Sequence, residues 1–372
     1  MLTLRPALPL HEVVLSQHMT PVYGVVCWLS TTPRRPTEAG AGTRAGPGPD
    51  RTRPGRGSAG TVVPMPSDIA VPDPLLLLPL RQRILERDLG VRAIHLHRAG
   101  HEELSHRFVE DTAENVYSIS KTVTALAVGI AAEEGLLQPD DLLVDHLPAP
   151  QGGYGRGVGR VTLRHLLTMT SGSPVLGFLD EEREHGDLAA LVLGTDLTAA
   201  PGERWEYSNA SIFLLSRVLT ERTGRTMRDW LMPRLFEPLG ILNPQWHTTR
   251  DCHSWGATGL HLKSGQLARI GRLLLQRGAH EGAQLVPAPW VDALHAESSW
   301  VATGDPEPES TRYGLGVWRC TPDGAWRADG AYGQFLLVLP AQEAVLTLTS
   351  HLEGRPGAEI LRAVWEELLP LL

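Results

Sequence analysis

The chain has 372 residues, of which 42% are hydrophobic and 20% are charged, a balance typical of a soluble globular protein with a large core. A formal net charge of −8 argues against nucleic acid or an anionic membrane as the main partner. No stretch reaches the roughly 20 apolar residues that a membrane-spanning helix needs. Three widely separated cysteines favour neither a disulfide framework nor a zinc site. Because the N-terminus lacks a secretory pattern, we expect a cytoplasmic protein.

Residues 31–68 are rich in Gly, Pro, Arg and Thr and almost lack large apolar side chains. Such a segment cannot bury enough surface to offset the entropy lost on ordering. We therefore predict a disordered tail over residues 1–72 and one folded domain over residues 73–372. The first 30 residues are either a dispensable extension or a region upstream of the true start, for which Met65 is a candidate.

The folded part is predicted to begin with a helix over residues 74–89, whose core-facing residues are Leu75, Leu76, Leu78, Leu85 and Leu89. Two strands over residues 91–98 and 103–109 follow as a hairpin. Four histidines lie in this hairpin, at positions 95, 97, 101 and 106. Because their spacing fixes no third ligand, we interpret them as solvated strand residues rather than as a metal site.

From residue 118 to about residue 250 the pattern is helical. The predicted helices cover residues 118–134, 161–169, 186–193, 210–223 and 227–236, and two more follow over residues 264–277 and 289–296. From Tyr313 the period falls to two, which predicts strands over residues 313–319, 325–328, 334–339 and 344–349, before a closing helix over residues 357–371. This order predicts an α+β fold in which N- and C-terminal segments form one antiparallel sheet, flanked by helices, with an all-helical lobe inserted over about residues 118–250.

The tetrad Ser118-Ile119-Ser120-Lys121 opens the longest of these helices. Positions i and i+3 are neighbours on a helix, so the Ser118 hydroxyl and the Lys121 amine share one face. Seryl oxygen is a poor nucleophile at neutral pH, and burial of an amine favours its neutral form, which can accept the seryl proton. The helix N-terminus also favours developing negative charge. Lys121 is one of only two lysines in the chain, with Lys263, which makes its presence here more telling.

Tyr207 and Asn209 follow about ninety residues after Ser118, directly before a predicted helix. A tyrosine that loses its proton to a cationic neighbour can act as a base, and an asparagine amide can hold the lysine and receive a substrate carbonyl or amide. The alternative is that Tyr207 opens the helix and Asn209 is its N-cap.

In this combination the sequence resembles the serine β-lactamase and penicillin-recognising enzyme superfamily, close to its class C and esterase branch. The resemblance covers roughly residues 75–371 and includes the connecting segments 161–172, 236–241 and 256–260. It implies that Ser118 attacks a carbonyl and forms an acyl-enzyme. It also implies that Lys121 and Tyr207 share the general-base and general-acid work, and that Asn209 orients the substrate and the lysine.

The superfamily's third motif is a Lys or His, a small residue and a Gly on a strand that faces the serine. Its best match is Ala328-Asp329-Gly330, followed by Ala331, whose backbone N–H is expected to join that of Ser118 as the oxyanion hole. The basic residue is missing, which disfavours recognition of a β-lactam carboxylate. The segment resembles more the branch of esterases and nylon-oligomer amide hydrolases, and Asp329 is expected to favour a neutral or cationic substrate.

We predict a serine hydrolase without metal or cofactor that cleaves a small-molecule carboxylic ester or amide, with Asn209, Asp329, Gly330 and Ala331 in the substrate-binding site. Within enzymes, the alternative is a β-lactamase or a D-alanyl-D-alanine carboxypeptidase. From another class, the alternative is a catalytically silent binding protein that keeps the fold. The sequence carries no indication of an oligomeric state.

Overall fold

The computed structural model describes residues 75–178 and 186–372, so the predicted tail over residues 1–72 lies outside the described residues. The main sheet has eight strands in the order β2-β1-β12-β11-β10-β9-β8-β7. Two strands come from the start of the domain, β1 (Val91–Arg98) and β2 (Leu104–Arg107). Six come from its end: β7 (Val301–Ala302), β8 (Arg312–Tyr313), β9 (Trp318–Arg319), β10 (Trp326–Gly330), β11 (Gln334–Leu339) and β12 (Ala344–Ser350).

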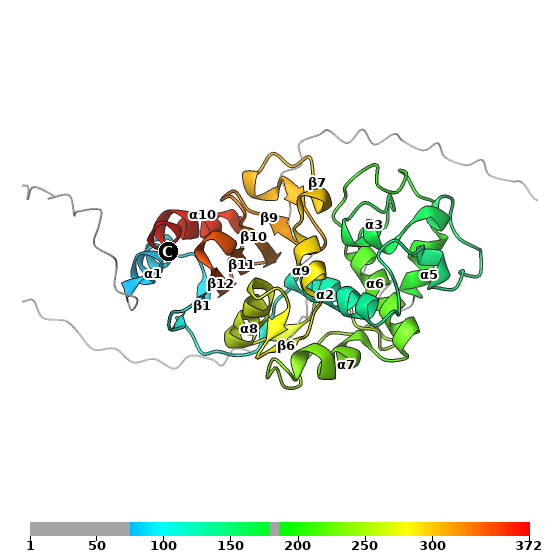
Figure 1. Ribbon diagram of the computed structural model, residues 1–372. Coiled ribbons are helices and arrows are strands. Elements are labelled where there is room, and N and C mark those ends of the chain that lie inside the picture. Colours follow the sequence, from blue (N-terminus) through cyan, green and yellow to red (C-terminus); the bar gives the residue numbers. More distant parts are fainter. Residues whose placement is uncertain (1–74, 179–185) are drawn as a thin grey trace, which may run out of the picture. The chain divides into compact units, whose positions relative to one another are not determined.

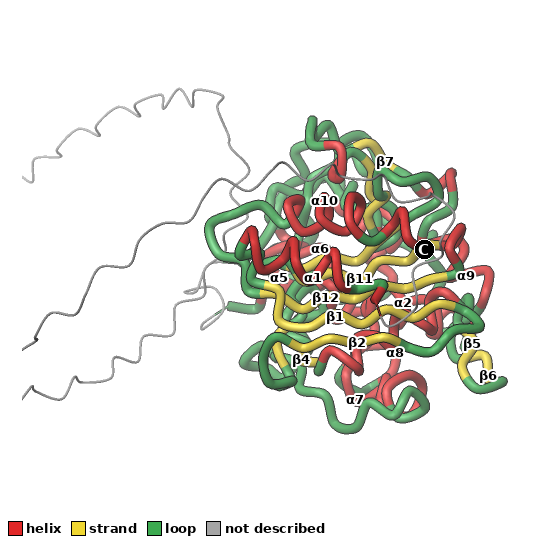
Figure 2. The backbone as a smooth tube through the Cα atoms, turned by 90° about the vertical axis from the view of Figure 1, so that its left-hand side faces the viewer, coloured by secondary structure: helices red, strands yellow, loops and turns green. Residues whose placement is uncertain are grey.

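The two chain segments join where β1 pairs antiparallel with β12, and the other strand pairs of this sheet are also antiparallel. Helices α1 (Leu78–Arg87) and α10 (Ala358–Glu367) cover one face of the sheet, as Figure 2 shows. Helices α2 (Ile119–Glu133) and α8 (Ser264–Leu275) pack on the other face. The predicted α+β fold, with one antiparallel sheet from both ends of the domain, is therefore confirmed.

Both faces of the sheet are buried, and every residue of β11 is buried in turn. Successive side chains of a strand point to opposite faces. Phe335, Leu337 and Leu339 join the apolar cluster under α1 and α10, whereas Leu336 and Val338 join the cluster that contains α2. A strand covered on both sides reads as a continuous apolar run, which explains the sequence of β11.

The inserted helices are α3 (Leu163–Leu167), α5 (Leu188–Gly194), α6 (Asn209–Thr223) and α7 (Met227–Leu231), which continues as one π-helical turn (Met232–Phe236). Among the described residues between 118 and 250 there is no strand of the main sheet. Figure 1 shows α2 between the sheet and helices α3, α5 and α6. Every residue of α2 from Ile119 to Ala131 is buried, because this helix has neighbours on all sides.

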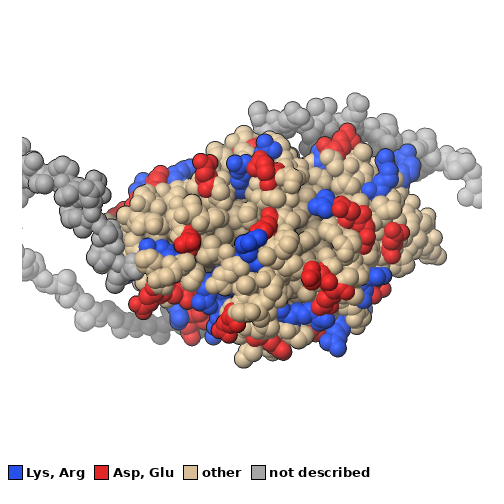
Figure 3. Space-filling view, in the orientation of Figure 1, with Lys and Arg blue, Asp and Glu red and all other residues tan. Residues whose placement is uncertain are grey.

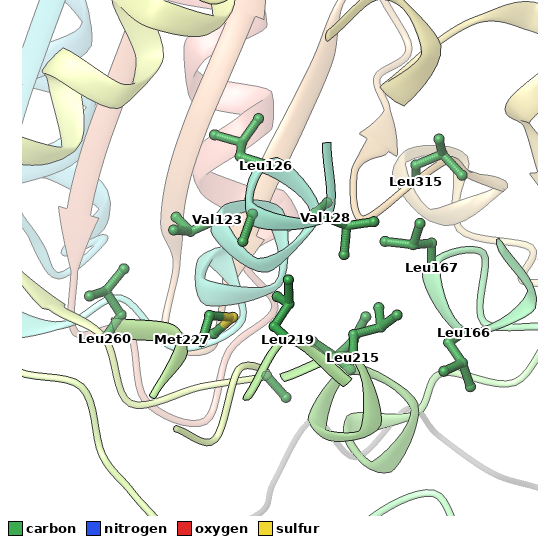
Figure 4. Packing of buried hydrophobic residues seen from close by; sticks show 14 of the residues in the cluster. Val123, Leu126, Val128, Leu166, Leu167, Leu215, Leu219, Met227, Leu260 and Leu315 are labelled. Carbon is green, nitrogen blue, oxygen red and sulfur yellow. The ribbon is translucent and has the colours of Figure 1, made fainter. Parts of the chain in front are cut away.

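The largest apolar cluster is organised around α2. Figure 4 shows Val123, Leu126 and Val128 of α2 with Leu215 and Leu219 of α6. All five side chains are fully buried, with no exposed surface. This packing fixes α2, and therefore the tetrad at its N-terminus, against both the sheet and the inserted helices.

The predicted core face of the first helix is wrong at three positions. Leu75, Leu78 and Leu85 are exposed, at 49%, 49% and 68% of their surface, whereas Leu80 and Ile84 are buried. Leu80 and Ile84 are four residues apart and share one face of α1. In the run Leu75 to Leu78 every position is leucine, so hydrophobicity alone does not indicate which side faces the core.

This correction predicts unequal effects of two leucine substitutions in α1. Leu80→Ala is expected to lower the free energy of unfolding by about 2–5 kcal/mol, because it leaves a cavity in the core. Leu85→Ala, the matched control on the exposed side, is expected to change it by less than about 0.5 kcal/mol. Urea denaturation of both variants checks this, and equal losses would show that the assigned face of α1 is incorrect.

The surface carries charges of both signs. On the face shown in Figure 3, basic and acidic side chains are interspersed. Several form exposed ion pairs, such as Arg156 with Asp196 and Arg164 with Asp140, both with N to O distances of 2.7 Å. No helix in the described part of the chain is both long enough and apolar enough to cross a membrane.

Candidate active site

Ser118 and Lys121 lie together at the start of α2, one helical turn apart. The Lys121 Nζ is 2.8 Å from the Ser118 Oγ and donates a hydrogen bond to the backbone oxygen of Ala257 at 2.9 Å. The Lys121 side chain is completely buried. Burial lowers the pKa of Lys121 to about 7, and the negative charge of Asp329 opposes this shift. At neutral pH a substantial fraction of this amine is therefore unprotonated and able to accept the Ser118 proton.

The backbone turns sharply just before Ser118. Tyr117 has a φ of +48°, in the left-handed region that residues with a side chain rarely adopt. Its N–H donates a hydrogen bond to the Asn115 Oδ1 at 2.8 Å, and the Val116 N–H donates to the Leu260 backbone oxygen at 2.8 Å. The short strands β3 (Glu114–Asn115) and β4 (His261–Leu262) pair alongside. These bonds hold the strained turn that presents Ser118 at the helix N-terminus.

Tyr207 reaches the same place from the inserted helices. The Lys121 Nζ is 4.8 Å from the centroid of the Tyr207 ring. Tyr207 directly precedes Ser208, which is the N-cap of α6 and accepts a hydrogen bond from the Ser211 N–H at 3.0 Å. The interpretation of Asn209 as the N-cap is therefore wrong, because Asn209 is the first residue of the helix. The structure brings Ser118, Lys121 and Tyr207 together.

Asn209, two residues after Tyr207, is half-buried, and its backbone N–H donates a hydrogen bond to the Leu176 oxygen at 2.8 Å. Within residues 75–178 and 186–372, no hydrogen bond links the Asn209 amide to Lys121. The Ala257 carbonyl holds the lysine instead. Ala257 follows Gly256, whose φ is +65°, so the oxygen that binds Lys121 belongs to a turn of small residues. This turn was not predicted to be part of the site.

An aromatic group surrounds Tyr207. Its ring is stacked on Trp318, with centroids 6.0 Å apart and an angle of 21°, and meets the edge of Tyr313 at 6.1 Å. Tyr313 is 1% exposed, and burial raises its pKa well above the usual value, with further contributions from Tyr207 and Asp329. Sequence analysis did not assign Tyr313 or Trp318 to the site.

The predicted strand over residues 313–319 is split by a turn into β8 and β9, which explains why the two aromatic residues were missed. The Gly314 N–H donates to the Val317 oxygen at 2.8 Å, and Gly316 has a φ of +79°. The turn places Tyr313 and Trp318 face to edge, with ring centroids 4.7 Å apart. Glycine inside a strand pattern often marks such an irregularity, and these two glycines were the available signal.

The third-motif residues lie at the end of β10 and in the turn to β11. A Cβ atom on Gly330 would come within 2.3 Å of the Val116 oxygen, so only glycine allows this strand end to approach the segment before Ser118. Ala331 is half-buried in the turn that follows. Asp329 is paired with Arg327, whose Nε donates a hydrogen bond to the Asp329 Oδ2 at 3.1 Å and whose Nη2 forms an ion pair with the same oxygen at 3.0 Å. Ala328, in place of the basic residue, is 1% exposed and packs in the core.

The strand histidines do not form a metal site within the described residues. His95 differs from the predicted solvated state, because its side chain is 11% exposed and its Nε2 lies 3.2 Å from the Ser264 Oγ. Burial lowers the pKa of His95. His101 is exposed on the hairpin turn, as predicted.

The beta-lactamase family model matches residues 91–369. The chain belongs to the beta-lactamase family. The resemblance inferred from the Ser118 tetrad and its partner motifs is thereby confirmed. Among curated relatives of this beta-lactamase family member, an uncharacterized protein of Alkalihalophilus pseudofirmus is 24% identical over 279 residues, which cover 66% of this chain and 76% of the relative. Protein flp of Staphylococcus aureus is 26% identical over 157 residues, 41% of this chain, and the match spans only 32% of flp.

Solved structures share the fold of this beta-lactamase family member. A candidate 6-aminohexanoate-dimer hydrolase of Bacillus anthracis has a TM-score of 0.64 at 20% identity, covering 76% of this chain and 79% of that one. SurE, solved with D-Leu, has a TM-score of 0.65 at 23% identity, with 80% and 74% covered. A penicillin-binding protein homologue of Caulobacter crescentus has a TM-score of 0.64 at 18% identity, with 82% and 99% covered. At these identities the likeness shows the fold.

Proposed function

We propose that this member of the beta-lactamase family is a serine hydrolase that cleaves a carboxylic ester or amide through an acyl-enzyme on Ser118. The observation that carries the proposal is the buried Lys121 amine, 2.8 Å from the Ser118 Oγ. A seryl oxygen next to a base of near-neutral pKa is an activated nucleophile. Burial lowers the pKa of Lys121 to about 7, which matches this requirement.

In the proposed reaction the Ser118 Oγ attacks the substrate carbonyl carbon while its proton moves to the Lys121 amine. The bond to the leaving group then breaks, and the leaving group takes a proton from the Lys121 and Tyr207 pair. Water, deprotonated by the same groups, attacks the acyl-enzyme and releases the acid with Ser118 restored. Ser118 and then water attack the carbonyl carbon, and each attack places negative charge on the carbonyl oxygen. This oxyanion needs hydrogen-bond donors to stabilise it.

The backbone N–H groups of Ser118 and Ala331 are the proposed oxyanion donors. Among the described residues, neither group donates a hydrogen bond to another residue, so both are available for a ligand. Loss of one such donor typically costs about 10²–10³-fold in kcat. The close approach of Gly330 to the Val116 oxygen brings the two short backbone segments next to each other.

The direct test is hydrolysis of short-chain nitrophenyl esters, small amides and a chromogenic β-lactam by the full chain. Wild type is expected to turn over an ester or amide, and Ser118→Ala is expected to reduce turnover to background. Ser120→Ala is the matched control, since Ser120 lies two residues along the same helix and its Oγ accepts a hydrogen bond from the Leu260 N–H at 3.3 Å. Turnover that survives Ser118→Ala rules out Ser118 as the nucleophile, and a folded wild type that cleaves nothing favours the silent binding protein.

We expect kcat/KM to increase with pH up to about pH 7, the pKa of Lys121. The base must be unprotonated, so activity is lost as pH falls through the pKa of Lys121, which burial lowers to about 7. The profile is expected to rise about tenfold per pH unit below pH 7 and to level off above it. Stopped-flow or plate measurement of kcat/KM between about pH 5 and pH 9 with a neutral ester checks this. A limb that falls between pH 6 and 8 as pH rises would contradict the role of Lys121.

Substrate charge is the second part of the proposal. Ala328 replaces the basic residue of the third motif, and Asp329 is paired with Arg327, so this strand end offers no free cation to a substrate carboxylate. We therefore expect neutral esters or amides to be cleaved better than β-lactams and other carboxylate-bearing substrates, with cationic ones intermediate. If an anionic ester is cleaved as well as its neutral counterpart, and Asp329→Asn changes neither rate, this assignment fails.

A further inference from the structure

Two tyrosines with left-handed backbones lie next to the two proposed oxyanion donors. Tyr117 has a φ of +48° and directly precedes Ser118. Tyr332 has a φ of +63° and directly follows Ala331. Most positions with a positive φ in the described part of the chain are glycines, which adopt this region without strain. A strained residue persists only where its surroundings hold it, so the contacts of the two tyrosines matter.

The two tyrosine rings contact each other. Their centroids are 5.1 Å apart, with an angle of 56° between the rings. The His351 ring is stacked on that of Tyr332, also at 5.1 Å, with an angle of 19°. The Leu352 N–H donates a hydrogen bond to the Tyr332 oxygen at 3.0 Å, and the His351 N–H donates to the Gly90 oxygen at 2.9 Å. Tyr332 is therefore fixed both at its ring and at its backbone.

The turn between β10 and β11 is held against the segment before Ser118 on both sides of Ala331. Before Ala331, Gly330 packs so closely that an added Cβ would lie 3.2 Å from the Tyr117 Cβ. After Ala331, the Tyr332 ring meets the Tyr117 ring. The two contacts together fix the backbone of Ala331 relative to that of Ser118.

We propose that Tyr117 and Tyr332 are positioning residues, whose ring contact sets the separation of the Ser118 and Ala331 N–H groups. The proposal deepens the proposed function, on which it rests for its catalytic meaning. Within residues 75–178 and 186–372, neither tyrosine hydroxyl forms a hydrogen bond with another residue, so the rings carry the effect. Because the oxyanion develops only during the reaction, a change in donor separation lowers kcat more than it alters KM.

Glycine at position 332 removes the ring and also releases the backbone strain, so the variant is expected to fold. Tyr332→Gly is expected to lower kcat for a neutral ester by about 10–10²-fold with KM nearly unchanged, since a displacement of about 1 Å can cost about 10²-fold in rate. Tyr332→Phe keeps the ring and is expected to restore most of this kcat. If Tyr332→Phe loses as much as Tyr332→Gly, the hydroxyl is responsible and the proposal is overturned.

Tyr117→Gly removes the other half of the contact and is expected to cause a similar loss of kcat. The double variant Tyr117→Gly/Tyr332→Gly is then expected to be no slower than the slower single variant, because residues in contact have non-additive effects. Losses that multiply in the double variant would show that the rings act independently, which overturns the proposal. Wild-type kcat in Tyr332→Gly also overturns it.

Glu343→Gly is the matched control. Glu343 is exposed, has a φ of +46° and lies in the turn between β11 and β12, at the opposite end of β11 from Tyr332. The change therefore releases the same kind of backbone strain far from Ser118. It is expected to keep wild-type kcat, and a loss as large as that of Tyr332→Gly would overturn the proposal.

Hydrogen exchange of the substrate-free full chain separates this proposal from the proposed function, because it needs no turnover. The Ser120 N–H donates to the Tyr117 oxygen at 3.0 Å and closes the first turn of α2. Tyr332→Gly is expected to speed amide exchange at the start of α2 several-fold, whereas Glu343→Gly is not. Unchanged exchange in Tyr332→Gly overturns the proposal. Faster exchange in a protein that cleaves no ester supports the ring contact while it leaves the proposed function refuted.

Discussion

Replacing Lys121 with methionine is expected to lower kcat/KM for a neutral ester by about 10²–10⁴-fold, the usual contribution of a positioned base. The Lys121 Nζ is 2.8 Å from the Ser118 Oγ and is held by the Ala257 oxygen, so its removal leaves the seryl proton without an acceptor. Methionine is similar in length and apolar, and α2 is buried around this position. Replacing a buried ionisable group by an apolar one of similar volume is often neutral or stabilising.

Lys263→Met is the matched control for this loss, because Lys263 is the only other lysine and is exposed at the start of α8. It is expected to keep wild-type kcat/KM. Thermal unfolding of both variants should show that Lys121→Met is folded, so that the loss is chemical. A folded Lys121→Met with more than about a tenth of wild-type activity would remove Lys121 from the general-base role that typically contributes 10²-fold or more.

Gly330→Ala is expected to cost both activity and stability. The added Cβ would lie 2.3 Å from the Val116 oxygen and 3.2 Å from the Tyr117 Cβ, so backbone on one side or the other must move. Overpacking of this kind typically costs about 1–3 kcal/mol. Because Val116 and Tyr117 lead directly into Ser118, the nucleophile is displaced as well, and a displacement of about 1 Å can cost about 10²-fold in rate.

Gly159→Ala is the control for Gly330→Ala. No heavy atom lies within 4 Å of the Cβ that would be added at Gly159, and neither glycine has a positive φ. Urea denaturation and ester turnover of the two variants are expected to show a large loss for position 330 and almost none for position 159. Wild-type kinetics for a folded Gly330→Ala would contradict the close packing of β10 against the segment before Ser118.

The sequence was sufficient for the fold because the relevant signals are local and repeated. Helix α2 is apolar from Val123 to Ala132 except at Thr124, and strands β11 and β12 were predicted within one residue of their observed bounds. The tetrad spacing also placed the Ser118 hydroxyl and Lys121 amine on one face, because that follows from helix geometry alone.

The missing parts of the site depend on contacts between distant segments. The Ala257 oxygen that holds Lys121 comes from a turn 136 residues away, and backbone oxygens have no sequence signature. Tyr313 and Trp318 meet Tyr207 only because a turn splits their strand. Asp329 is paired with Arg327 and not free, and strand spacing indicates only that the two share a face.

The central claim is that Ser118 is a nucleophile activated by a buried, near-neutral amine. The most direct measurement is the reaction of the full chain with a fluorophosphonate, followed by intact mass and peptide mapping. We predict one adduct per chain on Ser118, lost in Ser118→Ala, retained in Ser120→Ala, and formed faster as pH rises through about 7, the value to which burial lowers the pKa of Lys121. A well-folded wild type that forms no adduct, or one that is modified at another residue, would contradict the claim.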